Sequence, residues 1–491
     1  MNFNSIEFLI FFPIVMLLNF VVPTKFRIIP LLAMSYYFYM SWNPELVFLI
    51  LFTTVVSYLS GLVIEKTESV AKRKVWLAIS IVASLAVLFF FKYYNFLAGG
   101  VSSIFSLFGG KADFTIEGLV LPVGISFYTF QTLSYSIDVY RKNIPAERNF
   151  LYYALFVSFF PQLVAGPIER PENLLPQLKV EHKLNISDLS IGAKRAISGF
   201  FKKVVVADIA GTYVNGVFNN PDSATGAAVV LASMLFAVQI YCDFSGYTDI
   251  AIGCGRMMGY RLMQNFDRPY SATNIKDFWS RWHISLTSWF KDYLYIPLGG
   301  NRKGKARMYV NLFIVFLVSG LWHGADMTFV IWGVLHGIYR VVGAVTAKKR
   351  DGIYGKMGLD INSKPVLFFR RIITFLLVCF AWIFFRANNT QELVVLLSKL
   401  FTDFGAMSVL SDMGFTLSSV LILVLSIVLL SMIDRRYTYG NYDSVTGEKI
   451  GVDAATLLVW AIIFAWILIL GGDATSSIAS GGASAFIYFQ F

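Results

Sequence analysis

Charged residues are scarce in this sequence: they make up 14% of its 491 residues, while 56% are hydrophobic. A soluble globular chain carries about 25% charged residues, so the composition excludes an ordinary soluble protein. A helix needs roughly 20 apolar residues to cross ~30 Å of hydrocarbon. Most or all of such a span is supplied by eight runs: residues 6–22, 47–64, 75–91, 227–240, 310–321, 368–385, 417–433 and 457–470. Shorter or more polar candidates are residues 28–42, 119–137, 150–165 and 329–345. Together with the eight runs they predict roughly ten to twelve transmembrane helices.

Cysteine is rare, and several catalytic motifs are missing. The three cysteines, Cys242, Cys254 and Cys379, lie in apolar or glycine-rich surroundings without paired spacing, which indicates neither a disulfide framework nor a zinc site. The sequence contains no G-x-S-x-G elbow and no H-E-x-x-H motif. Serine-hydrolase and zinc-protease functions are therefore disfavoured.

Positive charge is confined to a few segments, although the net charge is +11. Lysine and arginine concentrate in residues 66–74, 141–148, 291–307, 347–371 and 435–436. These segments lie between apolar runs, so the positive-inside rule places them in the cytoplasm and explains the charge without nucleic acid. The N-terminus then lies outside. The first apolar run has no preceding Lys or Arg and no small-residue cleavage site, which predicts a retained helix and not a signal peptide.

Two of the four histidines share a G-x-x-H-G frame: His323 in Gly320–Gly324 and His336 in Gly333–Gly337. Small residues four apart let helices approach closely. An ionisable residue at membrane depth is costly, so a functional use is the default hypothesis, with a structural hydrogen bond as the alternative. A continuous helix would separate the two histidines by ~20 Å and turn them to different faces. We therefore expect them to act separately, with Asp326 capping a helix that begins at Met327.

A strongly amphipathic helix is predicted around His283. One narrow sector holds Lys276, Ser280, His283, Thr287 and Lys291, and the opposite face carries aromatic residues. Tryptophan and tyrosine in such a pattern are typical of the membrane interface. Either this helix lies on the headgroups with His283 on its wet side, or His283 faces a polar cavity that enters the membrane.

Charged residues also occur in two apolar contexts. Asp243 and Asp249 are expected either to mark helix ends around Gly246 or to pair with Arg and Lys. The stretch "GFFKKVVVAD", residues 199–208, is expected to be interfacial or re-entrant.

Several long motifs, in order along the chain, resemble those of the membrane-bound O-acyltransferases, and most closely the branch that O-acetylates alginate, peptidoglycan and exopolysaccharides. The resemblance covers about residues 122–387 and rests on "PVGISFYTFQTLSYSIDVYR", "LVAGPIERPENLLPQL", "DFSGYTDIAIG", "NFDRPYSATNIKDFWSRWHISLTSWFKDYLYIPLGGNRKG", "SGLWHGADMTFVIWGVLHG" and "AWIFFRA".

The resemblance implies an all-α polytopic fold in one domain, residues 1–491, with a ring of tilted helices and re-entrant or interfacial pieces around a central funnel. It implies that His323 is the essential histidine and His283 its upstream polar partner, while His336 has no catalytic role. A basic group could meet the phosphates of a CoA-type donor, although a positive-inside anchor explains it equally well: Lys291, Arg302, Lys303 and Lys305.

The implied function is transfer of an acetyl group from a cytoplasmic thioester, such as acetyl-CoA, to an extracytoplasmic hydroxyl. The acceptor would be a cell-surface polysaccharide or a secreted SGNH-type transferase, and the enzyme would lie in the cytoplasmic (inner) membrane among its lipids, with no bound cofactor, metal or nucleic acid. Two alternatives remain open. One is D-alanyl transfer to teichoic acid from a carrier-protein thioester, and the other is a transporter in which the histidines line a pathway.

Overall fold

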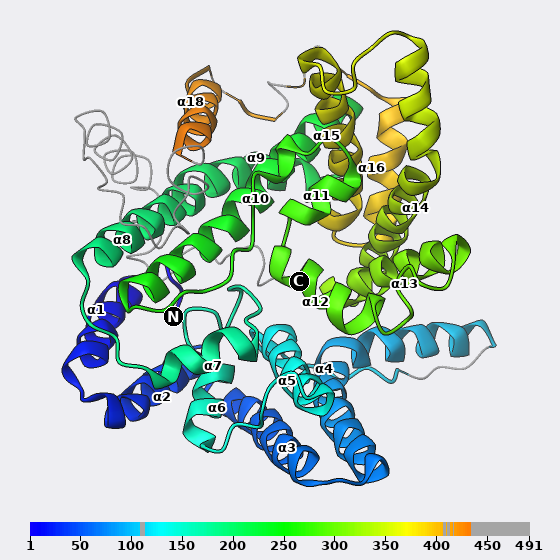
Figure 1. Cartoon of the computed structure of the whole chain (residues 1–491). Helices are drawn as coiled ribbons and strands as arrows, with labels where there is room; N and C mark the ends of the chain where they lie inside the picture. Colours follow the sequence, from blue (N-terminus) through cyan, green and yellow to red (C-terminus); the bar gives the residue numbers. More distant parts are fainter. Residues whose placement is uncertain (109–112, 406–408, 410–412, 416, 434–491) are drawn as a thin grey trace. The chain divides into compact units, whose positions relative to one another are not determined.

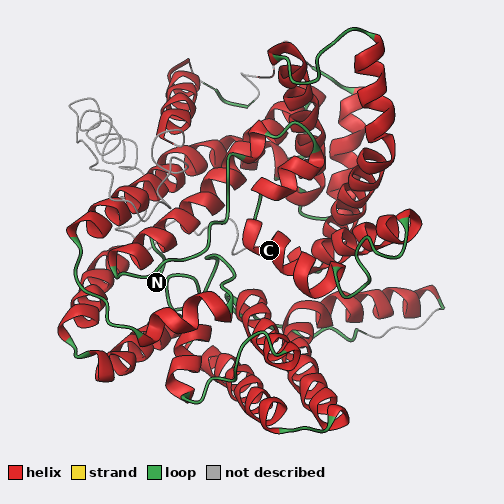
Figure 2. Cartoon of the chain, viewed as in Figure 1, coloured by secondary structure: helices red, strands yellow, loops and turns green. Residues whose placement is uncertain are grey.

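The computed structural model describes residues 1–108, 113–405, 409, 413–415 and 417–433. Every regular element in these ranges is helical, as Figure 2 shows, so the predicted all-α class is confirmed. Within them, six helices are long and apolar enough to cross a membrane: Pro44–Lys66, Val70–Leu107, Gly226–Met257, Lys305–His323, Met327–Lys356 and Lys364–Arg386. Shorter apolar helices are Ile6–Val21 and Val420–Ser431. The apolar run 457–470 lies outside the described residues.

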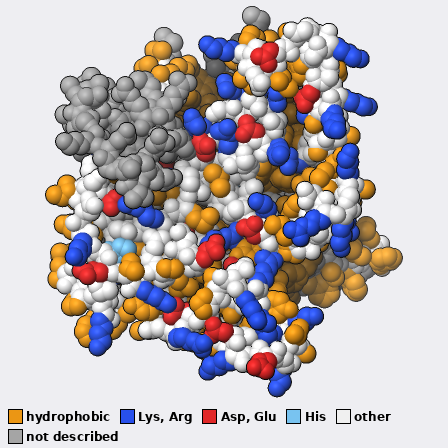
Figure 3. Space-filling model, in the orientation of Figure 1, with side chains coloured by type: hydrophobic (Ala, Val, Ile, Leu, Met, Phe, Trp, Pro, Cys, Tyr) orange, Lys and Arg blue, Asp and Glu red, His pale blue; other side chains and the backbone are white. Residues whose placement is uncertain are grey.

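Many helices turn large hydrophobic side chains outward. Leu9, Phe48, Phe89 and Phe368 are all exposed, and Figure 3 shows hydrophobic side chains reaching the surface at many places. Monomeric soluble proteins rarely expose large apolar patches. These faces are the ones that the lipid of a bilayer would cover.

The chain divides into two compact units, of which the first comprises Met1–Ala196 and Tyr247–Met263. It contains α1 (Ile6–Val21), α2 (Thr24–Met40), η1 (Pro44–Leu46), α3 (Val47–Lys66), α4 (Val70–Leu107), α5 (Ile125–Arg141), α6 (Phe150–Ser158), α7 (Pro171–Lys179) and most of α8 (Ile186–Phe200). Helices α3, α4 and α5 pack side by side (Figure 1). The approach is close at Gly61, where an added Cβ would lie 2.6 Å from the Tyr135 ring.

The second unit comprises Ile197–Gly246 and Gln264–Phe491. Its described elements are η2 (Phe201–Ala207), α9 (Asp208–Phe218), most of α10 (Gly226–Met257), η3 (Pro269–Ser271), α11 (Ile275–Arg281), α12 (Ile284–Phe290), η4 (Lys291–Tyr295), α13 (Lys305–His323), α14 (Met327–Lys356), α15 (Lys364–Arg386), α16 (Thr390–Thr402) and α18 (Leu417–Ile433). Helix α14 packs against both α13 and α15 (Figure 1).

The two aspartates on α10 pair with basic residues. Asp243 lies 2.9 Å from Lys203 Nζ, and Asp249 lies 2.9 Å from Arg195 Nε. Helix α10 continues through Gly246 without a break. The pairing prediction is confirmed, whereas the prediction of helix ends is wrong, because α10 runs from Gly226 to Met257.

The stretch predicted to be interfacial or re-entrant is largely buried within the protein. Residues Phe201–Ala207 form a π-helix, η2, and all seven are buried, including Lys202 and Lys203. Lys203 is stabilised there by Asp243 and by Asp208, whose Oδ1 lies 2.8 Å from the ammonium. Paired carboxylates let a lysine leave water, so residues 201–207 are covered by protein, while the expected interfacial or re-entrant placement in the membrane stays a prediction.

Candidate functional site

The two glycine frames lie opposite each other in a helical hairpin. Helix α13 ends at His323, Gly324 is extended (φ −159°, ψ 155°), and Asp326 caps α14 by accepting from Thr328 N at 2.8 Å. A Cβ added to Gly320 or Gly333 would lie 3.0 Å from the other glycine's Cα. The close approach and the Asp326 cap were predicted correctly. The continuous helix was wrong, because the chain reverses direction between His323 and Met327.

This reversal brings both His323 and His336 into contact with the indole of Trp332. Their ring centroids lie 5.0 and 4.8 Å from that of Trp332. The expected ~20 Å separation is therefore wrong, since it assumed one helix. His336 is fully buried, and its Nδ1 accepts a hydrogen bond from Trp279 Nε1 at 3.2 Å. It joins α11 to α14.

His323 sits in an aromatic cage at the end of α13. It is 5% exposed, and its ring centroid lies 4.9 Å from that of Trp322 and 5.2 Å from that of Phe385. An imidazole in this position is held by ring contacts on several sides and is shielded from bulk water. Such surroundings suit a proton transfer that must exclude solvent.

His283 lies at a break between two short helices. It has a left-handed backbone (φ 45°, ψ 56°) between α11 and α12, and it is fully buried. Its ring contacts Phe244 at 4.8 Å and Trp322 at 6.0 Å between centroids. The single amphipathic helix with His283 on its wet face is therefore wrong. Burial lowers the pKa of His283 to about 3, so the imidazole is neutral at physiological pH.

Asn265 holds this break and was missed by the sequence analysis. Its backbone carbonyl accepts from Ile284 N at 2.8 Å. Its side-chain Oδ1 lies 3.0 Å from His283 Nδ1 and accepts from Ser285 N and Oγ at 3.3 and 2.9 Å. A residue 18 positions upstream thus supplies the cap that His283 itself does not provide. The sequence signal was only its presence in the quoted "NFDRPY" stretch.

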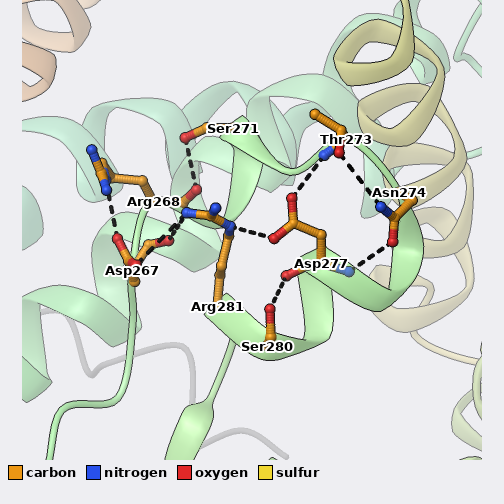
Figure 4. A network of polar contacts seen from close by, with 8 residues as sticks. All are labelled: Asp267, Arg268, Ser271, Thr273, Asn274, Asp277, Ser280 and Arg281. Carbon is orange, nitrogen blue, oxygen red and sulfur yellow. Dashed lines mark hydrogen bonds and ion pairs between the residues drawn. The ribbon is translucent and has the colours of Figure 1, made fainter. Parts of the chain in front are cut away.

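A polar network fastens the loop that leads into α11 and His283 (Figure 4). Asp267 N donates to Arg281 O at 2.9 Å and closes the loop. Arg281 Nε donates to Asp277 at 2.7 Å, and Asp277 also accepts from Thr273 N at 3.0 Å. A single exposed ion pair contributes little to the free energy of folding. Here several contacts share the same groups and fix the ends of the loop.

Three of the four basic residues predicted to meet the donor lie near the start of α13, the end of that helix opposite His323, and the fourth, Lys291, directly follows α12. All are exposed: Lys291 begins η4, and Arg302, Lys303 and Lys305 lie in or just after the turn before α13. Asn311 Nδ2 fastens this turn by donating to Gly300 O at 2.9 Å. Helix α13 from Lys305 to His323 spans ~27 Å at 1.5 Å per residue. The structure therefore brings His283 and His323 together around Trp322, but it places Arg302, Lys303 and Lys305 near the opposite end of α13 from His323.

Among the described residues, no three His, Cys, Asp or Glu side chains are grouped so that they could hold a metal ion. Cys242, Cys254 and Cys379 are buried thiols. The arrangement therefore offers acid–base chemistry by two buried imidazoles, those of His283 and His323, which both contact the indole of Trp322.

Comparison with known proteins identifies the group to which these features belong. The family model of the membrane-bound O-acyltransferases matches residues 53–347. The protein named probable alginate O-acetylase of Pseudomonas putida is 37% identical over 500 residues, covering the whole of both chains. The peptidoglycan O-acetyltransferase of Helicobacter pylori is 37% identical over 396 residues, which is 75% of this chain and 73% of the relative.

A third relative lies further away. The teichoic acid D-alanyltransferase of Bacillus subtilis is 30% identical over 239 residues, covering 45% of this chain and 58% of its own length. The family match includes both histidines that contact Trp322 and most of the spanning helices. The chain belongs to the membrane-bound O-acyltransferase family and is an integral membrane O-acyltransferase.

Proposed function

We propose that this enzyme transfers acetyl groups from a cytoplasmic thioester to hydroxyl groups of an extracytoplasmic polysaccharide. The observation that carries the proposal is the meeting of His323 and His283 around Trp322, inside the region that the family model matches. Two of the relatives of this chain are named for O-acetylation. The family match contains parts of both structural units. We therefore treat residues 1–491 as one acyltransferase domain.

His323 acts as the general base in this proposal. An imidazole has an unperturbed pKa near ~6.5 and can take the proton of an attacking hydroxyl. As the hydroxyl oxygen bonds to the thioester carbonyl carbon, its proton passes to His323. The carbonyl then re-forms as the carbon–sulfur bond breaks, and the sulfur takes the proton from His323 and leaves as a thiol. His283 positions one of the substrates.

The basic turn before α13 and His323 at the end of α13 are placed so that two substrates could approach from opposite sides of the cytoplasmic membrane. The positive-inside rule places the basic turn before α13 in the cytoplasm, and His323 lies ~27 Å along the helix from it. A donor whose phosphates meet Arg302, Lys303, Lys305 or Lys291 needs a long flexible arm to deliver its acyl group. Acetyl-CoA and other phosphopantetheine thioesters have such an arm. The acceptor, a polysaccharide or an SGNH-type transferase, would arrive from the other side.

D-alanyl transfer is the second candidate, because one relative carries that name. It covers less than half of this chain at 30% identity, whereas the acetylase relative covers all of it at 37%. A transporter function has no support from these relatives, all of which are named as acyl-transferring enzymes.

The transferred group can be identified directly. Membranes that contain the wild-type protein, incubated with labelled acetyl-CoA and the host polysaccharide, should yield acetyl ester, and a D-alanyl carrier protein should yield none. His323→Ala should abolish the product, while His336→Gln serves as the matched histidine control. Ester formation from the D-alanyl carrier alone would replace the acetyl proposal with the second candidate.

A further inference from the structure

The contacts of Asn265 determine which ring nitrogen of His283 carries the proton. Ser285 N is a backbone N–H and can only donate, so the Asn265 side-chain atom that it meets at 3.3 Å must be the carbonyl oxygen. The amide orientation is thus fixed by the backbone. An oxygen in that position accepts from the Ser285 hydroxyl as well, at 2.9 Å.

The same oxygen lies 3.0 Å from His283 Nδ1. Because a carbonyl oxygen only accepts, Nδ1 must carry the hydrogen. A neutral imidazole has one N–H, so Nε2 then carries a lone pair. Burial keeps the ring neutral, with its pKa at about 3. His283 can therefore accept a hydrogen bond through Nε2 and cannot donate one from that atom.

We propose that Asn265 is a positioning residue that fixes His283 as the Nδ1–H tautomer, so that Nε2 accepts a hydrogen bond from a hydroxyl of the acceptor substrate. This inference rests on the proposed function. It excludes the other role considered for His283, donation to the developing oxyanion, which requires an N–H at Nε2. Since His323 takes the proton of the attacking hydroxyl, the group that His283 binds is a different hydroxyl of the same acceptor. The expected acceptor is thus a polyol such as a sugar ring.

The backbone conformation of His283 also indicates that Asn265 holds this residue in place. A left-handed conformation is disfavoured for a non-glycine residue, and strained residues of this kind concentrate at functional sites. Asn265 contacts three consecutive residues through its side chain and its carbonyl group: His283, Ile284 and Ser285. It therefore sets both the backbone and the tautomer. Two groups of charged residues on the surrounding elements form ion pairs: Asp243 with Lys203, and Arg281 with Asp277 and Asp267.

Three variants distinguish an Asn265 that sets the tautomer of His283 from an Asn265 that only caps α12. Asn265→Ala removes the acceptor and should raise the acceptor KM at least tenfold, while the KM of acetyl-CoA stays unchanged. Asn265→Asp keeps an acceptor for Nδ1–H and adds a negative charge, which raises the pKa of the His283 imidazole by about 1–3 units. Its acceptor kcat/KM should fall on acidification at a pH where the wild type is still level. Ser285→Ala removes one hydrogen bond to the same oxygen and should leave both KM values within about twofold.

A spectroscopic measurement does not depend on turnover. The chain has four histidines, so ¹⁵N-histidine labelling gives few ring resonances, and loss of signals in His283→Asn assigns those of His283. The wild type should show Nδ1 protonated and Nε2 unprotonated, and Asn265→Ala should change that pattern. A protonated Nε2 in the wild type, or an unchanged acceptor KM in folded Asn265→Ala, would overturn the inference. A His323→Ala rate within about twofold of the wild-type rate would instead overturn the proposed function.

Discussion

Replacing Gly333 with alanine tests how the two glycine frames pack. An added Cβ would lie 2.5 Å from Phe316 O and 3.0 Å from Gly320 Cα, and both of these atoms belong to the backbone of α13. Real Cβ atoms essentially never approach this closely, so α13 and α14 must move apart. Overpacking of this kind costs about 1–3 kcal/mol. Because His323 is three residues beyond Gly320 on α13, the same movement should disturb the contacts of His323 with Trp332 and lower acetyl transfer.

Gly343→Ala is the matched control on the same helix. Nothing lies within 4 Å of a Cβ at Gly343, so this substitution should be neutral, or stabilising by up to about 1 kcal/mol through helix propensity. The assay is thermal unfolding of each purified variant in one detergent, followed by acetyl transfer at a temperature where both are folded. Equal stability and equal activity of Gly333→Ala and Gly343→Ala would refute the packing argument.

Further substitutions test His283, His336 and the basic turn before α13. His283→Asn should keep more activity than His283→Ala, and it should also weaken the acid sensitivity of the fold. The pKa of buried His283 is lowered to about 3, so the unfolded chain binds the proton first, and the stability of the wild type should fall by about 1.4 kcal/mol per pH unit below pH ~6.5. Equal activity of the two variants, or a variant whose stability falls with acidification as steeply as that of the wild type, would contradict this. His336→Gln should lower thermal stability by about 0.6 kcal/mol and leave transfer largely intact, and complete loss of activity in the folded variant would mean that the two glycine frames act together. Changing Arg302, Lys303 and Lys305 to glutamine should raise the KM for acetyl-CoA several-fold without changing the acceptor KM, and an unchanged donor KM would leave the turn as a topological anchor.

Local patterns in the sequence were sufficient for the helix contacts of the hairpin. The four-residue glycine spacing predicted close approach, and Asp326 predicted the start of α14. The spacing of two histidines along the chain could not give their separation in space, because that depends on the three-residue turn between α13 and α14. Once the turn is known, both imidazoles meet at Trp332.

The break at His283 had no local signal. The sequence from Ile275 to Tyr293 contains neither glycine nor proline, and its periodicity fits one amphipathic helix. The helix is interrupted because Asn265, 18 residues earlier, bonds His283, Ile284 and Ser285. A long-range hydrogen-bonding partner of this kind cannot be found from helical periodicity, and the burial of His283 follows from it.

The role of His323 is tested most directly by single-turnover acetyl transfer in proteoliposomes. Labelled acetyl-CoA is supplied on the side of the basic turn and an oligosaccharide acceptor on the other, with wild type, His323→Ala and His336→Gln at equal amounts of folded protein. Loss of a general base should slow His323→Ala by about 10²–10⁴-fold, while His336→Gln stays close to the wild-type rate. A His323→Ala rate within about twofold of wild type would contradict the account.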